Sequence, residues 1–329
     1  MKIPRCLISL CAFAALVGCT PAAEPDDSAD PETEDTGDSG DTDDTGDTGD
    51  TIPPRTLESG EHSLEHDGLQ RRFVLHRPED LPVGAPLVVV LHGYGGTAAG
   101  IQAYAGMDAV ADREGFAVVY PQGMRDAWNQ PYWEVGYAFH DGEVDDVGFV
   151  RALRELVVAD LGLDPGRVFA TGMSNGGDMS YRLACEADDA FAAVAPVAGC
   201  LMGVIQERCA PASQPSLLEI HGTADPITPW EGDPDGSDGY GPYLGTEESV
   251  GHFVEAYGLD LYEQEALPDL APDDGSHVIA HRWGSSGADA EVWLYEIVGG
   301  RHDWPGSGGN RDIQASEEIW SFFARRIQG

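Results

Sequence analysis

One stretch constrains the fold of this chain more than any other: residues 167–178 read RVFATGMSNGGD. The apolar run VFA predicts a short buried strand, and the apolar residues after the glycines recur at helical spacing. Between them, Gly172 to Gly176 match the pattern Gly-x-Ser-x-Gly, in which a sharp turn raises a serine hydroxyl above a sheet. A short pattern of this kind also occurs in ordinary glycine-rich loops. The strand before it and the helix after it favour Ser174 as a nucleophile.

A serine hydroxyl becomes a nucleophile only when a base takes its proton and a third group orients that base. The expected order along the chain is serine, acid, histidine. Asp225 follows an apolar run at 217–220, and His302 follows another at 291–297. Because open α/β sheets assemble their sites beyond the carboxyl ends of strands, we expect Ser174, Asp225 and His302 to form a catalytic triad.

Such a triad also requires an oxyanion hole, in which backbone N–H groups face the developing negative charge. A strand-like run at 87–91 leads into His92 and the glycine-rich letters GYGG. By position, we expect the N–H of Tyr94 to be one donor, because it follows a glycine that permits close approach, and the N–H of Asn175 to be the other. We expect His92 to hold this loop rather than to act as a base.

These motifs belong to longer blocks, which read LHGYGG, VDDVGFVRAL, DPGRVFATGMSNGGDMSYRLACE, HGTADPITPW and GGRHDWPG. With them, the segment from Gly68 to Ile327 resembles the secreted polyhydroxybutyrate depolymerase and feruloyl esterase family of the α/β-hydrolases. The resemblance implies a serine esterase with the triad and oxyanion donors at the positions above. It implies no cofactor and no metal. Within that family it leans towards esters of plant cell-wall polysaccharide, with polyester depolymerisation as the alternative.

The rest of the chain agrees with an α/β-hydrolase. Apolar strands alternate with amphipathic helices, which predicts one domain at 55–329 with a doubly wound, mainly parallel sheet and helices on both faces. The expected strands are 71–77, 86–92, 116–121, 167–173, 192–197, 216–221, 277–283 and 291–297, and the expected helices are 97–114, 145–162, 175–187, 246–257 and 315–327. We expect Asp145 and Asp146 to cap the second of these helices.

The first residues predict export. Residues 1–18 combine basic residues with an apolar run that is too short to span a membrane, as in a signal peptide. The letters LVGC resemble a bacterial lipobox, so Cys19 is the expected site of lipidation, and ordinary cleavage near Ala22 or Ala23 is the alternative.

The next segment, 19–54, is expected to be a disordered acidic tether, because the part from Glu24 to Asp50 holds thirteen acidic residues and no basic ones. Its aspartates lack the glutamate that a calcium loop needs at position twelve. We therefore expect an exported protein that is lipid-anchored to the outer membrane or cell surface, or extracellular.

The formal charge of the whole chain is −40. Without the two basic residues of the signal segment and the thirteen acids of the tether, −29 remains on residues 51–329. Such a charge excludes nucleic acid as an expected partner and disfavours polyanionic substrates, whereas a neutral ester is little affected. We expect a neutral ester, polysaccharide-linked or polyester, as the substrate, and membrane contact only through the lipid.

Two other classes of function fit the sequence less well. The spacing Gly-x-Gly-x-x-Ala of a dinucleotide-binding turn occurs at Gly93, Gly95 and Ala98. The next strand, however, ends in VVYPQG and lacks the acidic residue that binds ribose in such proteins. A non-catalytic surface-binding lipoprotein on the same fold is the other alternative, and the filled triad positions argue against it.

The pockets for the two halves of the ester are expected to be built by the loops 124–143 and 230–246. Trp230 and Trp304 flank the acid and base segments, so we expect both to line the acyl pocket as substrate-binding residues.

Three cysteines remain in the predicted domain, Cys185, Cys200 and Cys209. An odd number in an oxidising compartment predicts one disulfide and one free thiol. The resemblance favours Cys185 with Cys209, whereas Cys200 with Cys209 would close the shorter loop.

Overall fold

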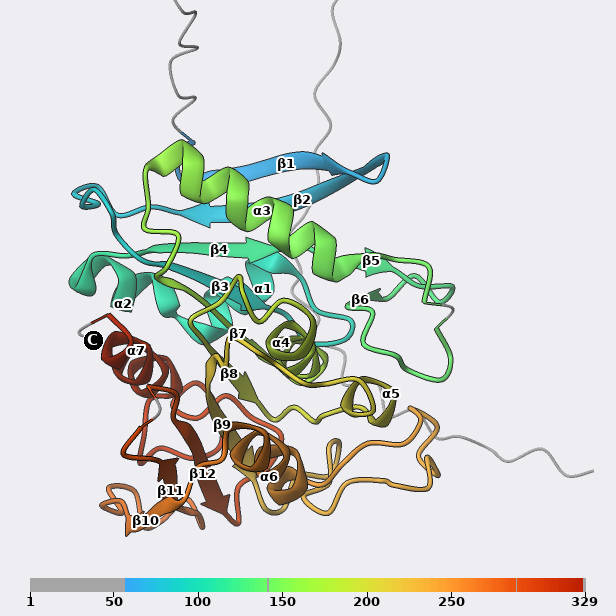
Figure 1. Ribbon diagram of the computed structural model, residues 1–329, viewed down its shortest axis with the longest axis vertical. Coiled ribbons are helices and arrows are strands. Elements are labelled where there is room, and N and C mark those ends of the chain that lie inside the picture. The colour runs from blue at the N-terminus through green and yellow to red at the C-terminus, as the bar shows by residue number, and fades with distance from the viewer. Residues whose placement is uncertain (1–56, 141, 288, 328–329) are drawn as a thin grey trace, which may run out of the picture. The chain divides into compact units, whose positions relative to one another are not determined.

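The computed structural model describes residues 57–140, 142–287 and 289–327 (Figure 1). All of them lie in one compact unit. The predictions for the signal peptide 1–18, for lipidation at Cys19 and for the tether 19–54 lie outside these residues. In the described part of the chain, each helix is too short or too polar to span a membrane.

Ten strands of the described residues form one sheet. In spatial order they are β1 (Gly60–His66), β2 (Leu69–His76), β4 (Ala117–Pro121), β3 (Leu87–Leu91), β7 (Val168–Met173), β8 (Ala193–Val197), β9 (Ser216–Gly222), β12 (Val292–Val298), β11 (His277–Gly284) and β10 (Leu261–Ala266). The six central strands, from β4 to β12, pair in parallel, and the two outer strands at each edge pair antiparallel. A separate short hairpin consists of β5 (Met124–Arg125) and β6 (Pro131–Tyr132).

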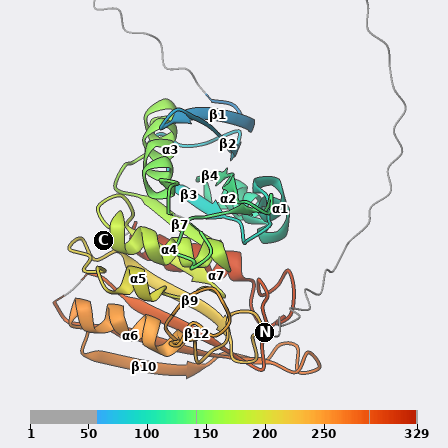
Figure 2. The same ribbon diagram turned by 90° about the vertical axis from the view of Figure 1, so that its right-hand side faces the viewer.

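Helices cover both faces of this sheet. They are α1 (Ala98–Ala105), α2 (Met107–Glu114), α3 (Asp146–Leu161), α4 (Asn175–Glu186), α5 (Gly203–Gln206), α6 (Thr246–Tyr257) and α7 (Ala315–Arg325). Side chains of α3, α4 and α6 share one apolar core, and those of α1, α2 and α7 share the other. Figure 2 shows α3, α4 and α6 on one side of the sheet and α1 and α2 on the opposite side. The predicted doubly wound α/β-hydrolase sheet is confirmed.

The central strand β3 shows why two helical layers are needed. Its five residues, LVVVL, are all fully buried. Leu87, Val89 and Leu91 point into the first core, and Val88 and Val90 point into the second, because successive side chains of a strand face opposite ways. Burying each such side chain contributes roughly 1.5–3 kcal/mol, so a strand that is apolar on both faces is stable only between two covers.

The eight predicted strands are present with shifts of one or two residues at their ends. The predicted helix 97–114 is instead two helices, because Gly106 adopts a left-handed φ of 66° and its N–H closes α1 on the carbonyl of Gln102. Strands β1 and β10 were not predicted. Every residue of β10 is exposed. A strand that buries neither face needs no apolar alternation, and its sequence LYEQEA shows none, so the pattern of a half-buried strand was absent.

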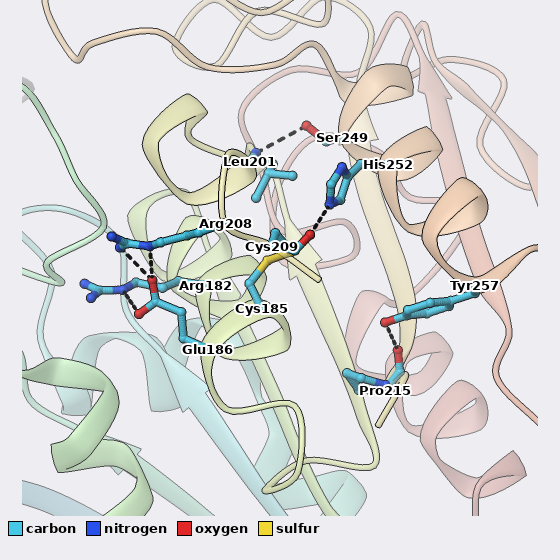
Figure 3. The surroundings of a disulfide bond; sticks show 10 residues. All are labelled: Arg182, Cys185, Glu186, Leu201, Arg208, Cys209, Pro215, Ser249, His252 and Tyr257. Atoms are coloured by element: carbon cyan, nitrogen blue, oxygen red, sulfur yellow. Dashed lines mark hydrogen bonds and ion pairs between the residues drawn. A yellow bond between two sulfur atoms is a disulfide. The ribbon is translucent and has the colours of Figure 1, made fainter. Parts of the chain in front are cut away.

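The disulfide joins Cys185, near the end of α4, to Cys209 (Figure 3). Cys200 is a buried free thiol. The Cα atoms of the two bonded cysteines are 4.7 Å apart. Nε2 of His252, on α6, donates to the carbonyl of Cys209 at 3.0 Å, so the bond lies where α4 and α6 meet the segment after α5. This is the pairing that the resemblance favoured.

The disulfide closes a loop between residues separated by 24 positions. A loop of that length predicts that reduction lowers the free energy of unfolding by about 3 kcal/mol, mainly by freeing the unfolded chain. Denaturant unfolding with and without reductant measures this effect. A Cys185→Ala/Cys209→Ala variant is the control, because its stability should not respond to reductant. An equal response of both proteins would contradict the prediction.

Candidate active site

The sheet brings three loops together. Strands β7, β9 and β12 run in the same direction, and Ser174, Asp225 and His302 follow their carboxyl ends. Strand β3 lies beside β7 and ends at the loop that begins with His92. The parallel sheet therefore places the predicted nucleophile, acid, base and oxyanion loop at one edge.

The turn at Ser174 is held in an unusual backbone conformation, with φ 57° and ψ −123°. Its N–H donates to the carbonyl of Val197 at 2.9 Å, and this bond fixes the turn against β8. A Cβ atom at Gly172 would lie 2.5 Å from the carbonyl oxygen of Gly176, and a Cβ atom at Gly176 would lie 2.3 Å from that of Leu91. Both positions of the Gly-x-Ser-x-Gly pattern thus require glycine, because the chain passes too close to itself for any side chain.

Asp225 and His302 form a short hydrogen bond, in which Nδ1 of His302 donates to Oδ2 of Asp225 at 2.6 Å. The other oxygen, Oδ1, accepts from the N–H groups of Ile227 at 2.7 Å and Thr228 at 2.9 Å. Burial alone would raise the pKa of Asp225, but the contact with His302 and these N–H groups outweigh it and lower that pKa. An ionised Asp225 fixes the proton of His302 on Nδ1, so Nε2 is the nitrogen that can act as a base.

Backbone contacts between two loops align this pair. Gly222 pairs with Ile297 where β9 and β12 end. Just beyond, the N–H of Ala224 donates to the carbonyl of Gly300 at 2.9 Å. A Cβ atom at Gly222 would lie 2.4 Å from the carbonyl carbon of Gly300, so glycine is required there. The close approach fixes the relative position of the acid and base segments.

The loop after β3 lies against the serine. Its His92 is buried; Nδ1 donates to the carbonyl of Gly93 at 2.8 Å, and Nε2 accepts from the N–H of Gly123 at 3.0 Å. Burial lowers the pKa of His92 to about 4, so it is neutral and structural, as expected. A Cβ atom at Gly93 would lie 3.4 Å from Cβ of Ser174, which shows how closely the loop approaches the serine.

The structure places both predicted oxyanion residues beside Ser174. Asn175 is the first residue of α4, where backbone N–H groups have no partner within the helix. Its side chain is locked to the backbone of Trp133, accepting from the N–H at 2.7 Å and donating to the carbonyl at 3.0 Å. Tyr94 contributes its side chain to the cavity next to Ser174, and its hydroxyl donates to Asp126.

Ser174 and His302 line one cavity of about 270 Å³. Four tyrosines line it too, together with apolar side chains and one buried carboxyl group, Asp178. The tyrosines are Tyr94, Tyr137, Tyr240 and Tyr243. Three of them come from the loops 124–143 and 230–246, so the prediction that these loops build the pocket is confirmed.

Comparisons with known proteins agree with this arrangement. Residues 75–227, which include Ser174 and Asp225, match the family described as Esterase PHB depolymerase. The protein NocK of Nocardia uniformis subsp. tsuyamanensis is 34% identical over 250 residues, which cover 73% of this chain and 72% of that protein. The chain belongs to the Esterase PHB depolymerase family.

Another relative is feruloyl esterase C of Emericella nidulans, 36% identical over 172 residues. That match covers 49% of this chain and 57% of that protein. Among solved structures, an acetyl xylan esterase from Aspergillus awamori superposes with a TM-score of 0.59 at 16% identity, covering 81% of this chain and 99% of that one. At this identity the superposition shows a shared fold.

The two predicted substrate-binding tryptophans are not among the described residues that line the cavity. Trp304 is 1% exposed, belongs to the core under α7 and donates from Nε1 to Oγ of Ser316 at 3.2 Å, so the prediction for Trp304 is wrong. Trp230 is half-buried and packs on the other core, with its ring 6.0 Å from that of His221. Both tryptophans were predicted to line the pocket because they lie close to Asp225 and His302 in the sequence. The direction of a side chain, however, depends on the path of its loop.

Of the cavity residues, the sequence predicted Tyr94, Ser174 and His302 but not the others, among which Asp178 carries a charge. Asp178 lies one helical turn after Ser174, and residues four apart on a helix share a face, so the spacing was an available signal. The prediction that Asp145 caps α3 is confirmed, since its side chain accepts from the N–H of Gly148 at 2.8 Å.

Among the described residues, one group could hold a metal ion. Its members are His66, Asp67 and Asp145, with one ligand atom of each within 4.8 Å of the others. The two aspartates are exposed, and Asp145 already caps α3, so the cluster has a structural explanation.

The buried carboxyl group predicts a specific pH dependence of stability. Burial raises the pKa of Asp178 from 3.8 to about 6, so the folded protein holds this proton more tightly than the unfolded chain. Ionising Asp178 therefore lowers the free energy of unfolding. This loss is absent at low pH, grows as the pH rises from about 4 to 6, and reaches about 3 kcal/mol above that range.

We expect Asp178→Asn to become more stable relative to the wild type as the pH rises, by about 2 kcal/mol between pH 4 and pH 7. Denaturant unfolding of both proteins at each pH measures the difference. A difference that stays constant with pH would contradict it.

Proposed function

We propose that this protein is a serine esterase that hydrolyses neutral carboxylic esters. The observation that carries the proposal is the hydrogen bond between Asp225 and His302, together with the cavity that both His302 and Ser174 line. Membership of an esterase family supports it.

In the proposed reaction, Nε2 of His302 takes the proton of the Ser174 hydroxyl as Oγ attacks the carbonyl carbon. The N–H groups of Tyr94 and Asn175 stabilise the negative oxygen of the tetrahedral intermediate. His302 then gives its proton to the departing alcohol, leaving an acyl group on Ser174. Water, activated by the same histidine, releases the acid. Asp225 orients His302 and stabilises its positive charge in both steps.

The proposed natural substrates are feruloyl-type esters of plant cell-wall polysaccharide. Four tyrosines on the cavity wall offer flat apolar faces with polar tips, which suit an aromatic acyl group. A relative named feruloyl esterase C supports this choice. Polyester depolymerisation is the second candidate, since the family description names PHB depolymerase and Met202 and Ile227 add apolar surface. The formal charge of −29 on residues 51–329 favours a neutral ester in either case.

Removing the serine hydroxyl tests the reaction. We expect Ser174→Ala to lower kcat on methyl ferulate by roughly 10⁴–10⁶ without loss of folding, because the nucleophile is gone while the turn remains. Ser321→Ala, on the exposed side of α7, is the matched control and should retain wild-type kcat. An alanine variant at 174 with near-normal turnover would refute the assignment. Acetylated xylan and hydroxybutyrate oligomers, assayed alongside, decide between the two candidate substrates.

We also propose that the chain is exported and held at the outer membrane or cell surface by a lipid on Cys19. The sequence LVGC and the acidic segment after it support this proposal. Cys19→Ser should move the enzyme from the membrane fraction to the soluble fraction and leave kcat unchanged, because a flexible tether isolates the domain. Fractionation followed by mass spectrometry of the mature N-terminus measures both. A wild type that is already soluble and unlipidated would contradict the proposal.

A further inference from the structure

Asp178 is a carboxyl group that the proposed reaction does not use, although it lines the catalytic cavity. It lies on α4, one turn after Ser174, and is 4% exposed. Its backbone N–H donates to the carbonyl of Ser174 at 2.9 Å, so its place below the serine is fixed by the first turn of the helix.

Two donors hold the carboxyl group in place. The hydroxyl of Tyr137 donates to Oδ2 at 2.5 Å, and the N–H of Cys200 donates to Oδ1 at 2.8 Å. The Cys200 thiol also contacts the carboxyl group as a donor. A carboxylate can accept about four hydrogen bonds, so room remains for a further donor. Among the described residues, no arginine or lysine forms an ion pair with Asp178. The group therefore offers the cavity an acceptor without an ion-pair partner among the described residues, and the charge of a protonated His302 in the same cavity lowers its pKa only as a minor contribution.

A carboxyl group in this position is costly. Burial raises the pKa of Asp178 to about 6, so at neutral pH the fold carries a mostly ionised group that it solvates poorly. An asparagine would satisfy both partners, because its oxygen can accept from the N–H of Cys200 and its NH₂ group can donate to the hydroxyl oxygen of Tyr137. A hydrogen-bond acceptor directed at a ligand explains why a full carboxylate stands in the wall of the cavity.

The cavity favours the acyl half of the ester as that ligand. The alcohol must leave so that water can replace it, whereas the acyl group stays bonded to Oγ of Ser174 in the intermediate and needs an enclosed place. An acetyl group would leave most of the 270 Å³ empty. The rings of Tyr137 and Tyr240, 5.2 Å apart and both in the wall, suit a flat aromatic acyl group.

We propose that Asp178, together with Tyr137, binds a phenolic hydroxyl on the acyl half of the substrate and so makes the enzyme select hydroxyaryl esters over their methyl ethers. This inference rests on the proposed esterase function. The hydroxyl donates to Asp178, and the bond is lost when a methyl group replaces the hydrogen. A carboxylate at the same place is rejected, because two negative charges would meet in a buried site.

Two methyl esters that differ only in this group test the proposal: methyl 4-hydroxycinnamate and methyl 4-methoxycinnamate. The readout is the ratio of their kcat/KM values on one enzyme preparation, which does not depend on how much of the preparation is folded. A buried hydrogen bond to a charged group predicts a ratio of roughly 10 to 100 for the wild type. Asp178→Asn should bring the ratio close to one, and Tyr137→Phe should lower it by a smaller factor.

Ser321→Ala, on the exposed side of α7 and away from the cavity, is the control, and its ratio should remain that of the wild type. A wild-type ratio near one, or a high ratio that Asp178→Asn leaves unchanged, would overturn the inference and leave the esterase intact. If the wild type cleaves neither ester and also fails on nitrophenyl acetate, the esterase function itself is refuted, and this inference falls with it.

Discussion

The close approach of the backbone at the ends of β3 and β7 determines the position of Ser174. Leu91 pairs with Gly172, and α4 begins so near this pair that Gly176 has no room for a side chain. The helix therefore starts directly above the sheet, and Ser174 takes a left-handed φ at its apex. Such strain costs on the order of 1–3 kcal/mol and persists only because the packed strands on both sides fix it. The loop after β3 and the cavity both lie against this turn.

A second layer of buried polar groups supports Asp225, the acid of the proposed triad. His221, on β9, lies between two carboxyl groups, with Nδ1 2.9 Å from Glu219 and Nε2 3.6 Å from Asp225. Its Nε2 also lies 2.9 Å from the carbonyl of Thr228, whose N–H donates to Asp225. Burial raises the pKa of Glu219 to about 7. The turn that carries Asp225 is thus held by buried groups of β9 and of the segment directly after it.

The wall of the cavity is supported in a similar way. Arg71 is buried, lies 3.8 Å over the ring of Phe149 and donates to Oδ1 of Asp146 at 2.5 Å. The other oxygen of Asp146 accepts from the N–H of Glu134 at 2.7 Å, three residues before Tyr137. Removing one partner of a buried ion pair typically costs about 3–5 kcal/mol, since the other charge is left unpaired. An interaction far from the serine in sequence thereby fixes the loop that carries a cavity tyrosine.

The sequence by itself determined the central strands, the turn at Ser174 and the positions of Asp225 and His302. These follow from local rules: apolar runs form buried strands, glycines permit sharp turns, and polar residues after parallel strands meet at one edge. The edge strand β10 escaped prediction because it is exposed on both faces, and the break at Gly106 depended on one backbone angle.

Only the tertiary structure decided which loop side chains line the cavity. It turned Trp304 into the core, brought Tyr137 and Tyr240 into the cavity wall and paired Cys185 with Cys209. The direction of a side chain on a long loop depends on contacts with residues far away in the chain, and no local pattern in the sequence encodes those contacts.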